Sequence, residues 1–244
     1  MSERPADTED SNSHVSRSIE LDRVGVTLNG NEVLREVTCS LSAKRIAVIG
    51  PNGSGKSTFA RLLNGLVTAS EGKIRVFGHD PDRDGKRLRR EVGFVFSNPA
   101  VQLIMPTVRE DLAMSLRGRG LARADIYARV AEVIAASPLA GRGDDPVHSL
   151  SGGQQQLLAL LGVELIEPRL IIADEPTALL DLVNSRAIAA RLLAVDAPQL
   201  VLVTHDLDLA RRCDLALRFD AGRLVEQGHP DQVVDSYLAS VSAE

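Results

Sequence analysis

The chain has 244 residues, of which 44% are hydrophobic and 25% charged, and its formal net charge is −5. This composition is typical of a globular protein with enough apolar residues for a real core, and the acidic balance argues against binding to nucleic acid. The longest apolar stretch, residues 157–166, is too short for a membrane-spanning helix of about 20 residues, and Cys39 and Cys213 fit no metal or disulfide spacing.

The first 18 residues are polar and lack periodicity, so we expect a disordered tail without a signal peptide and a folded domain at residues 19–244. Alternating apolar and polar residues predict a hairpin with strands at 19–27 and 33–41. Short apolar runs predict further strands at 45–49, 73–77, 92–96, 170–173, 200–204, 215–219 and 223–227. Helical spacing predicts helices at 56–66, 108–116, 124–136, 182–193 and from 230 onward.

Strands and helices alternate through most of the chain, which predicts an α/β fold around a mainly parallel sheet. The hairpin at the start forms an antiparallel β sublayer in this interpretation. Residues from about 101 to 165 form a helical subdomain beside the core.

A glycine-rich segment between a predicted strand and a predicted helix matches the pattern G-x-x-x-x-G-K-[ST]. It runs Gly50-Pro51-Asn52-Gly53-Ser54-Gly55-Lys56-Ser57, with Thr58 after it. Glycines let the backbone curve so that its N–H groups face a phosphate, the lysine reaches the β- and γ-phosphates, and the serine hydroxyl binds Mg²⁺. A chance match in a chain of this length has odds below about 1%, so we expect a site for ATP and Mg²⁺.

The predicted strand at 170–173 ends in two acids, Asp174 and Glu175. We expect this strand to lie beside the strand that precedes the phosphate loop, with Asp174 as a Mg²⁺ ligand and Glu175 as the base for the attacking water. A pair of surface acids at a helix start is the alternative, and the phosphate loop in the same chain argues against it.

The segment Leu150-Ser151-Gly152-Gly153-Gln154 resembles the signature of the ATP-binding-cassette (ABC) family. The resemblance spans residues 19–236 and implies a P-loop NTPase fold of the ABC type, with a RecA-like core. It also implies a head-to-tail dimer in which Ser151, Gly152, Gly153 and Gln154 cap the nucleotide of a second subunit. A plain helix N-cap at Ser151 is compatible with that role. In the same family pattern, Asp181 belongs to the D-loop at the dimer seam, and His205 contacts the γ-phosphate.

Two positions depart from the family pattern. Ser97, in Phe96-Ser97-Asn98-Pro99, replaces the usual Q-loop glutamine, so we expect slower or more partner-dependent hydrolysis. Leu28 stands where relatives place an aromatic residue that stacks on adenine, so with Leu28 or Val33 there we expect weak base selectivity.

Residues 98–108, with the pattern N-P-x-x-Q-x-x-x-P-T-V, are similar to energy-coupling-factor (ECF) transporter ATPases, which drive uptake of vitamins and of nickel or cobalt ions. The resemblance implies a transmembrane coupling subunit and a small substrate-binding membrane protein as partners, at the cytoplasmic face of the cell membrane. The partner copy is either identical or a related ATPase. We expect apolar contacts to the coupling helices from Met105, Val108, Leu112 and Met114, with ordinary core packing as the alternative for at least half of them. We also expect ion pairs from Glu110 and Asp111 to arginines of the partner.

Three other functions remain open at this point. The main alternative is the ATPase of another ABC importer, and a remote one is a soluble ABC ATPase that acts on ribosomes or DNA. A binding-only subunit is the third, which the intact Lys56, Asp174, Glu175 and His205 argue against. The identity of the transported substrate is not encoded here, because specificity lies in other subunits.

Overall fold

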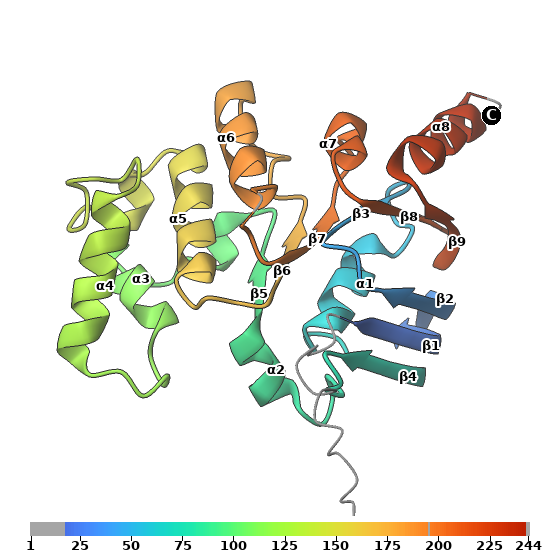
Figure 1. The fold of residues 1–244 in the computed structure, drawn as a ribbon, viewed down its shortest axis with the longest axis horizontal. Helices are drawn as coiled ribbons and strands as arrows, with labels where there is room; N and C mark the ends of the chain where they lie inside the picture. Colours follow the sequence, from blue (N-terminus) through green and yellow to red (C-terminus); the bar gives the residue numbers. More distant parts are fainter. Residues whose placement is uncertain (1–17, 195, 243–244) are drawn as a thin grey trace, which may run out of the picture.

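A six-stranded sheet organises the molecule. A computed structural model describes residues 18–194 and 196–242, and Figure 1 shows the sheet at its centre. Its strand order is β5-β6-β7-β3-β8-β9, parallel except for the antiparallel pair β8–β9. The strands are β3 (Arg45–Ile49), β5 (Val92–Val95), β6 (Leu170–Asp174), β7 (Gln199–Val203), β8 (Leu215–Asp220) and β9 (Arg223–Gly228).

The strand with Asp174 is not the neighbour of the strand that leads into the phosphate loop, and our prediction on this point is wrong. β7 lies between β3 and β6 and pairs with both in parallel register. All five residues of β7 are buried, and all but Gln199 are apolar. Such a strand suits the interior of a parallel sheet, with a neighbouring strand on each side. β7 thereby brings His205 to the same edge of the sheet as Asp174.

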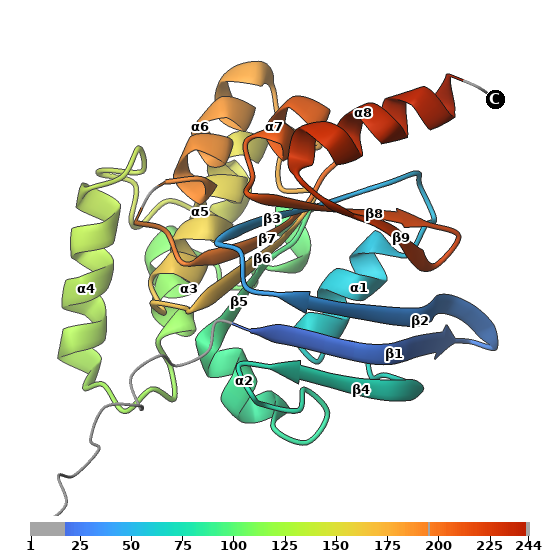
Figure 2. The ribbon, with the colours of Figure 1, turned by 45° about the vertical axis from the view of Figure 1, so that its right-hand side comes forward.

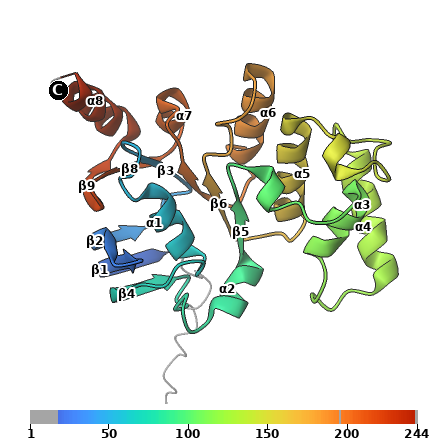
Figure 3. The same cartoon turned by 180° about the vertical axis from the view of Figure 1, so that it is seen from behind.

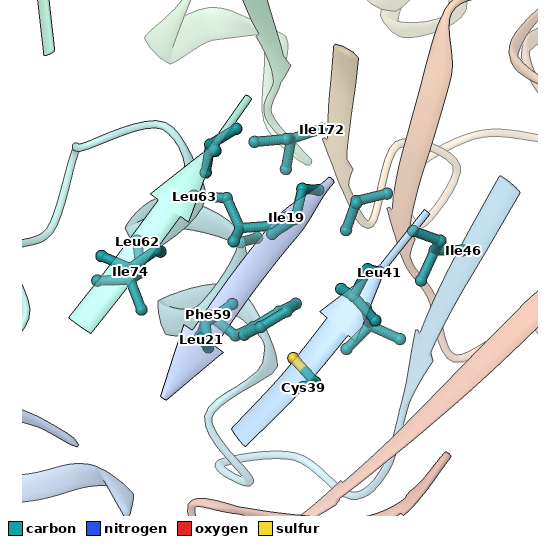
Figure 4. Close-up of a cluster of buried hydrophobic side chains, with 14 of the residues drawn as sticks. Ile19, Leu21, Cys39, Leu41, Ile46, Phe59, Leu62, Leu63, Ile74 and Ile172 are labelled. Carbon is teal, nitrogen blue, oxygen red and sulfur yellow. The ribbon is translucent and has the colours of Figure 1, made fainter. Parts of the chain in front are cut away.

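A three-stranded antiparallel sheet lies below the parallel one, with helix α1 (Lys56–Leu63) between the two layers (Figure 2). Its order is β2-β1-β4, formed by β1 (Ile19–Leu28), β2 (Asn31–Leu41) and β4 (Glu71–Val76). Side chains of α1, Phe59, Leu62 and Leu63, are fully buried among residues of both sheets (Figure 4). The Phe59 and Phe219 ring centroids are 5.0 Å apart, which fastens α1 to β8.

Helices cover the other face of the parallel sheet, where a second core cluster forms. They are α6 (Leu182–Leu192), α7 (Leu207–Arg211) and α8 (Pro230–Val241), together with α5 (Gly152–Glu164). Helix α7 and helix α2 (Gly85–Glu91) were not predicted from the sequence. Each is short, and α2 buries only Gly85 and Leu88 among basic residues, so neither shows an apolar period.

A helical block extends from one end of the sheet (Figure 3). It contains α3 (Val108–Ser115), α4 (Arg123–Ala135), α5 and the short 3₁₀ helices η1 (Pro99–Val101) and η2 (Val147–Ser149). A third core cluster holds the block together, and Val108 and Leu112 are completely buried in it. These two side chains are therefore core residues, and our prediction that they contact a membrane partner is wrong. In the described part of the chain, no helix has the length and apolarity needed to cross a membrane.

The two acids of α3 also make contacts inside the chain. The side chain of Thr107 caps α3 and donates to Glu110 Oε2 (2.8 Å). Asp111 Oδ1 accepts from the backbone N–H groups of Ile104 (2.9 Å) and Met105 (3.0 Å). Both carboxylates are thus used to fix the loop before α3, which leaves them poorly suited to the ion pairs with a partner that we predicted.

The turn between β8 and β9 supports the phosphate loop from behind. Gly222 N donates to Ser54 O (3.1 Å), and Gly222 O accepts from Arg35 N (2.8 Å). A Cβ atom on Gly222 would lie 2.6 Å from the carbonyl oxygen of Val33, and the residue has a φ of +81°. Only glycine meets both demands. No sequence pattern identifies this turn as part of the site.

We predict that Gly222→Ala destabilises the protein more than Gly30→Ala. Both glycines have φ near +80°, but a Cβ on Gly30 meets no atom within 4 Å. The backbone conformation costs about 1–2 kcal/mol in each variant, and the steric clash at Gly222 adds about 1–3 kcal/mol. Urea unfolding of the two variants measures the difference. Equal losses would show that the turn adapts freely to a side chain.

Candidate nucleotide-binding site

The phosphate loop lies between β3 and α1, and its shape depends on its glycines. Gly50, Gly53 and Gly55 all have positive φ, at +138°, +77° and +100°. A Cβ on Gly50 would lie 2.0 Å from the carbonyl oxygen of Phe219, so the loop packs directly on β8. Gly55 is the N-cap of α1, which points the free N–H groups of this helix at the loop. The arrangement forms an anion site.

Lys56 lies inside this loop. Its side chain is 7% exposed, and Nζ donates to Gly50 O and Pro51 O, both at 2.8 Å. Burial lowers the pKa of Lys56, while the nearby Glu175 and Asp174 act to raise it. The ammonium group is thus held at the phosphate loop by uncharged carbonyl acceptors, which a phosphate oxygen can outcompete. Along the same loop, Asn52 and Gly53 are exposed, Ser54 is 2% exposed, and Thr58 is half-buried on α1.

A hydroxyl and a carboxylate meet beside the loop. Ser57 Oγ donates to Asp174 Oδ1 (2.8 Å), which joins the start of α1 to the end of β6. Asp174 is 4% exposed, and its other oxygen is 3.9 Å from Nη2 of Arg61. Hard cations of the Mg²⁺ type prefer such oxygen ligands and often take only one or two from the protein, with phosphates and waters for the rest. These two side chains therefore fit a Mg²⁺ ion next to a bound phosphate.

Glu175 and His205 form a pair at the same edge. Glu175 Oε2 is 2.7 Å from His205 Nδ1 and accepts from His205 N at 3.3 Å. The Glu175 backbone has a φ of +52°, which is unfavourable for a residue with a side chain. A hydrogen bond from Glu175 N to Val203 O (3.0 Å) holds this conformation. The Glu175 carboxylate lies near Lys56 of the phosphate loop and acts to raise the pKa of this lysine.

The signature segment lies on the helical block. Ser151 caps α5 in a capping box: Gln154 N donates to Ser151 Oγ (3.4 Å), and Ser151 N donates to Gln154 Oε1 (3.0 Å). Arg142 Nη1 donates to Gln154 Oε1 (2.8 Å), a contact that the sequence analysis missed. No hydrogen bond among the described residues links this segment to the phosphate loop. The N-cap role of Ser151 therefore holds within the chain.

The two glycines of this segment differ in their surroundings. Gly152 has open space where a Cβ would point, whereas a Cβ on Gly153 would lie 2.3 Å from the side chain of Asn184. Asn184 in turn donates to both carboxylate oxygens of Asp181, from N (2.9 Å) and Nδ2 (2.7 Å). These hydrogen bonds lower the pKa of Asp181, the N-cap of α6. The signature and the start of α6 thus share one surface.

Comparison with known proteins settles the family. The profile of the family described as "ABC transporter" matches residues 34–178, more than half of the chain. The chain belongs to the ABC transporter family. It is an ATP-binding subunit that hydrolyses ATP, built on the ABC ATPase fold.

Three relatives of this ABC ATPase cover nearly all of it. A putative ABC transporter ATP-binding protein of Deinococcus radiodurans is 44% identical, over 90% of this chain and 96% of its own length. The biotin transport ATP-binding protein BioM of Rhizobium etli is 40% identical, over 90% of this chain and 97% of its own length. The structure of cbiO1 from Clostridium perfringens, part of the ABC transporter complex cbiONQ, has a TM-score of 0.78 at 28% identity, covering 91% and 92% of the two chains.

The backbone beside Ser97 is held by two glutamines from the helical block. Gln102 Oε1 accepts from Phe96 N (3.4 Å), and Gln156 Nε2 donates to Phe96 O (3.0 Å). Gln102 Nε2 also donates to Ala159 O on α5 (3.2 Å). The contact of neither glutamine with Phe96 was predicted from the sequence. The Phe96 peptide groups are thus fixed, and Ser97 follows them with a side chain shorter than the glutamine that the family pattern led us to expect.

Leu28 and Val33, the two residues expected near the adenine ring, lie at different positions along the hairpin. Leu28 ends β1 next to the turn and is 37% exposed. Val33 is half-buried on β2, and its carbonyl oxygen would be 3.0 Å from a Cβ on Gly55. The hairpin therefore packs against the phosphate loop at Val33. Both residues offer aliphatic contact only.

We predict that Ser97→Gln accelerates ATP hydrolysis by the ABC ATPase by about tenfold to a hundredfold, because a longer side chain positions the water more closely. Steady-state phosphate release at saturating ATP measures the effect. Ser97→Ala is the matched control and should leave the rate low. Unchanged turnover in Ser97→Gln, with and without the membrane partner, would refute a catalytic role for this position.

Proposed function

We propose that this ABC ATPase powers an ECF-type transporter that takes up a vitamin, biotin foremost, or a transition-metal ion. The segment from Asn98 to Val108 carries the proposal, together with the similarity to BioM. Three polar residues of its pattern stabilise the local structure, since Asn98 caps η1, Gln102 binds the Phe96 peptide, and Thr107 caps α3. The segment so built presents Val101 (63% exposed) and Ile104 (66% exposed) at the surface.

In our proposal these exposed side chains belong to the surface on which a membrane partner docks. Ile104, Leu103 and Met105 line a hollow of about 300 Å³ together with Val147 and Gln155. Exposed apolar residues beside a hollow are typical of contact surfaces. In our proposal a transmembrane coupling subunit, which works with a small substrate-binding membrane protein, contacts this surface from the membrane. The ATPase itself is peripheral, at the cytoplasmic face.

The site geometry suggests how this chain hydrolyses ATP. Lys56 and the loop N–H groups, including those near Asn52, Gly53, Ser54, Gly55 and Thr58, would hold the phosphates, and Ser57 with Asp174 would hold Mg²⁺. Mg²⁺ supplies positive charge that offsets the charge developing on the phosphates. Glu175 accepts a proton from the attacking water, and His205 orients this carboxylate through the 2.7 Å contact and approaches the γ-phosphate.

A second copy of the chain, or a related ATPase, would complete the site. Ser151, Gly152, Gly153 and Gln154 would reach the nucleotide of the partner, and Asp181 would line the seam. Three exposed apolar residues support a contact surface there: Leu179 (70%), Leu182 (64%) and Val183 (78%) flank Asp181. Monomers seldom expose such clusters. ATP then favours the closed dimer, and loss of the γ-phosphate opens it.

We predict that Glu175→Gln lowers ATP turnover by about 10²–10⁴-fold, because an amide cannot accept the proton. ATP binding should persist, and the variant should accumulate as a closed dimer with ATP in size-exclusion chromatography. Lys56→Ala is the control that should lose both binding and dimer. A Glu175→Gln variant that stays monomeric in ATP would contradict the proposed dimer.

The transport assignment predicts which proteins co-purify with the tagged chain. From gently solubilised membranes of its own host, we expect a coupling subunit and a small, very apolar substrate-binding protein, identified by mass spectrometry. The small molecule released from the latter identifies the cargo. A pair of ordinary permease subunits would assign the chain to another importer class. Recovery only in the soluble fraction, with ribosomes or DNA, would refute a role in transport.

A further inference from the structure

Helix α2 carries a dense cluster of basic side chains on its exposed side. Four of the five residues from position 86 to 90 are basic and exposed: Lys86, Arg87, Arg89 and Arg90. The remaining one, Leu88, is completely buried and anchors the helix in the core. Figure 1 shows α2 at the lower margin of the molecule, below β5. The cluster contrasts with the formal net charge of −5 for the whole chain.

The helical geometry of α2 spreads these charges over a convex surface. Successive residues of a helix are about 100° apart around its axis. Lys86 and Arg90 therefore lie about 160° from Leu88, on the face opposite the core. Arg87 and Arg89 lie about 100° from Leu88, one on each flank. Because long basic side chains bend at their methylene groups, the flanking charges can reach the plane of the central pair.

The acids at the two ends of α2 do not neutralise this cluster. Asp84 Oδ2 is 3.9 Å from His79 Nδ1, and Glu91 Oε2 accepts from Arg169 Nη1 at 2.7 Å. Both carboxylates thus face cationic or titratable groups outside the helix. Within residues 18–194 and 196–242, no ion pair engages any of the four basic side chains of α2. Their charges are therefore available to an anionic partner.

A hollow of about 530 Å³ lies along α2 and could hold phosphate groups. Its lining is basic except for one carboxylate, and consists of Arg83, Asp84, Lys86, Arg87 and Arg90. Arg83 adds a further cation just before the helix, although its Nε is 3.9 Å from Oδ2 of Asp80. Asp82 is exposed nearby but does not line the hollow. The hollow is thus a shallow basic surface.

The chemistry of this surface favours lipid headgroups over other anions. Single-stranded nucleic acid is usually held by stacking on aromatic side chains, and none of the described residues that line the hollow is aromatic. An acidic protein segment normally adds apolar anchors to its charges, and the exposed side of α2 offers none. A layer of lipid phosphates needs only closely spaced cations, each of which strengthens binding to an anionic membrane about fivefold.

The position of α2 agrees with such a contact. Lys86 and Gln102 line the same cleft, and Gln102 lies two residues before Ile104 of the surface that we assign to the membrane partner. The basic face of α2 thus adjoins that surface. A partner embedded in the bilayer would bring both surfaces toward the headgroups together.

We propose that the basic face of α2 binds the headgroups of anionic phospholipids, through Lys86, Arg87, Arg89 and Arg90. The contact is electrostatic, since no apolar side chain of this face can enter the bilayer. The inference goes beyond the proposed function, because it concerns lipid and its test needs no membrane partner.

Co-sedimentation of the full chain with protein-free vesicles tests the proposal. The ATPase should sediment with vesicles of phosphatidylglycerol and phosphatidylcholine in equal amounts, and not with phosphatidylcholine alone. Binding should be lost at about 1 M salt, where the screening length falls from about 10 Å to about 3 Å. Lys86→Glu with Arg87→Glu should weaken vesicle binding by about tenfold or more, because two attractive charges become repulsive.

A matched control separates the cluster from net charge. Arg23→Glu with Lys73→Glu makes the same change of charge at exposed positions of the antiparallel sheet and should bind vesicles as the unchanged protein does. ATP hydrolysis in solution should be equal in both double variants and in the unchanged protein, which shows that they fold.

A fluorescent label identifies the face that meets the vesicle. Arg83→Cys places a thiol in the hollow and keeps all four basic residues of α2. The native Cys39 and Cys213 are buried, at 9% and 7% exposure, so a maleimide dye labels the new thiol selectively. Bound vesicles should protect this label from acrylamide, a neutral quencher. A label at Ala190→Cys, an exposed position of α6 at the opposite margin in Figure 1, should stay accessible.

The outcomes separate this inference from the proposed function. Equal binding to both kinds of vesicle, unchanged binding of Lys86→Glu with Arg87→Glu, or equal protection of the two labels overturns the lipid contact. Tighter binding to double-stranded DNA than to vesicles, lost in the same variant, overturns it in favour of nucleic acid. Each of these results leaves the transport assignment standing if a coupling subunit co-purifies. Vesicle binding as expected without any co-purified membrane subunit refutes the transport assignment and supports this inference.

Discussion

The structure depends on the close approach of the phosphate loop to the strand behind it. At Gly50 the loop leaves so little room that a side chain would collide with the carbonyl of Phe219. The same strand places the Phe219 ring against Phe59 of α1, and the turn that follows it bonds to Ser54. The loop is thus held on two sides before any ligand binds, and binding need not order a flexible chain.

The order of the parallel strands decides which side chains meet at this loop. Because β7 lies between β3 and β6, the carboxyl ends of three strands converge on one edge. Asp174 reaches across to Ser57, and His205 comes next to Glu175. Acid, hydroxyl, lysine and histidine are therefore gathered from segments up to 149 residues apart in sequence, counted from Lys56 to His205 (205 − 56). This placement at the carboxyl ends of parallel strands is the usual one for sites in α/β sheets.

Much of this architecture could be predicted from the sequence, and the failures have physical causes. Strands with a strong apolar pattern, such as β3, were predicted with the observed bounds. The order of the strands in the sheet could not be predicted, because the apolar pattern of one strand does not indicate which strand lies beside it. The mixed set at 105–114 shows a further limit: Val108 and Leu112 are core, whereas Met114 is 38% exposed, and the sequence alone does not distinguish a helix face that packs inward from one that binds a partner. The supports at Gly222, Gln102 and Gln156 were missed, since each acts through contacts between residues distant in the chain.

The hold of the two glutamines on Phe96 has a mechanical consequence. Gln102 and Gln156 bind the N–H and the C=O of the same residue, and Gln102 also bonds to α5. A rotation of the helical block against the sheet would therefore act directly on the backbone of Phe96, the residue before Ser97. Phe96 is therefore held through both of its peptide groups, at its N–H and at its C=O. Under the proposed function, the length of the Ser97 side chain would then set how far such a motion reaches toward the nucleotide.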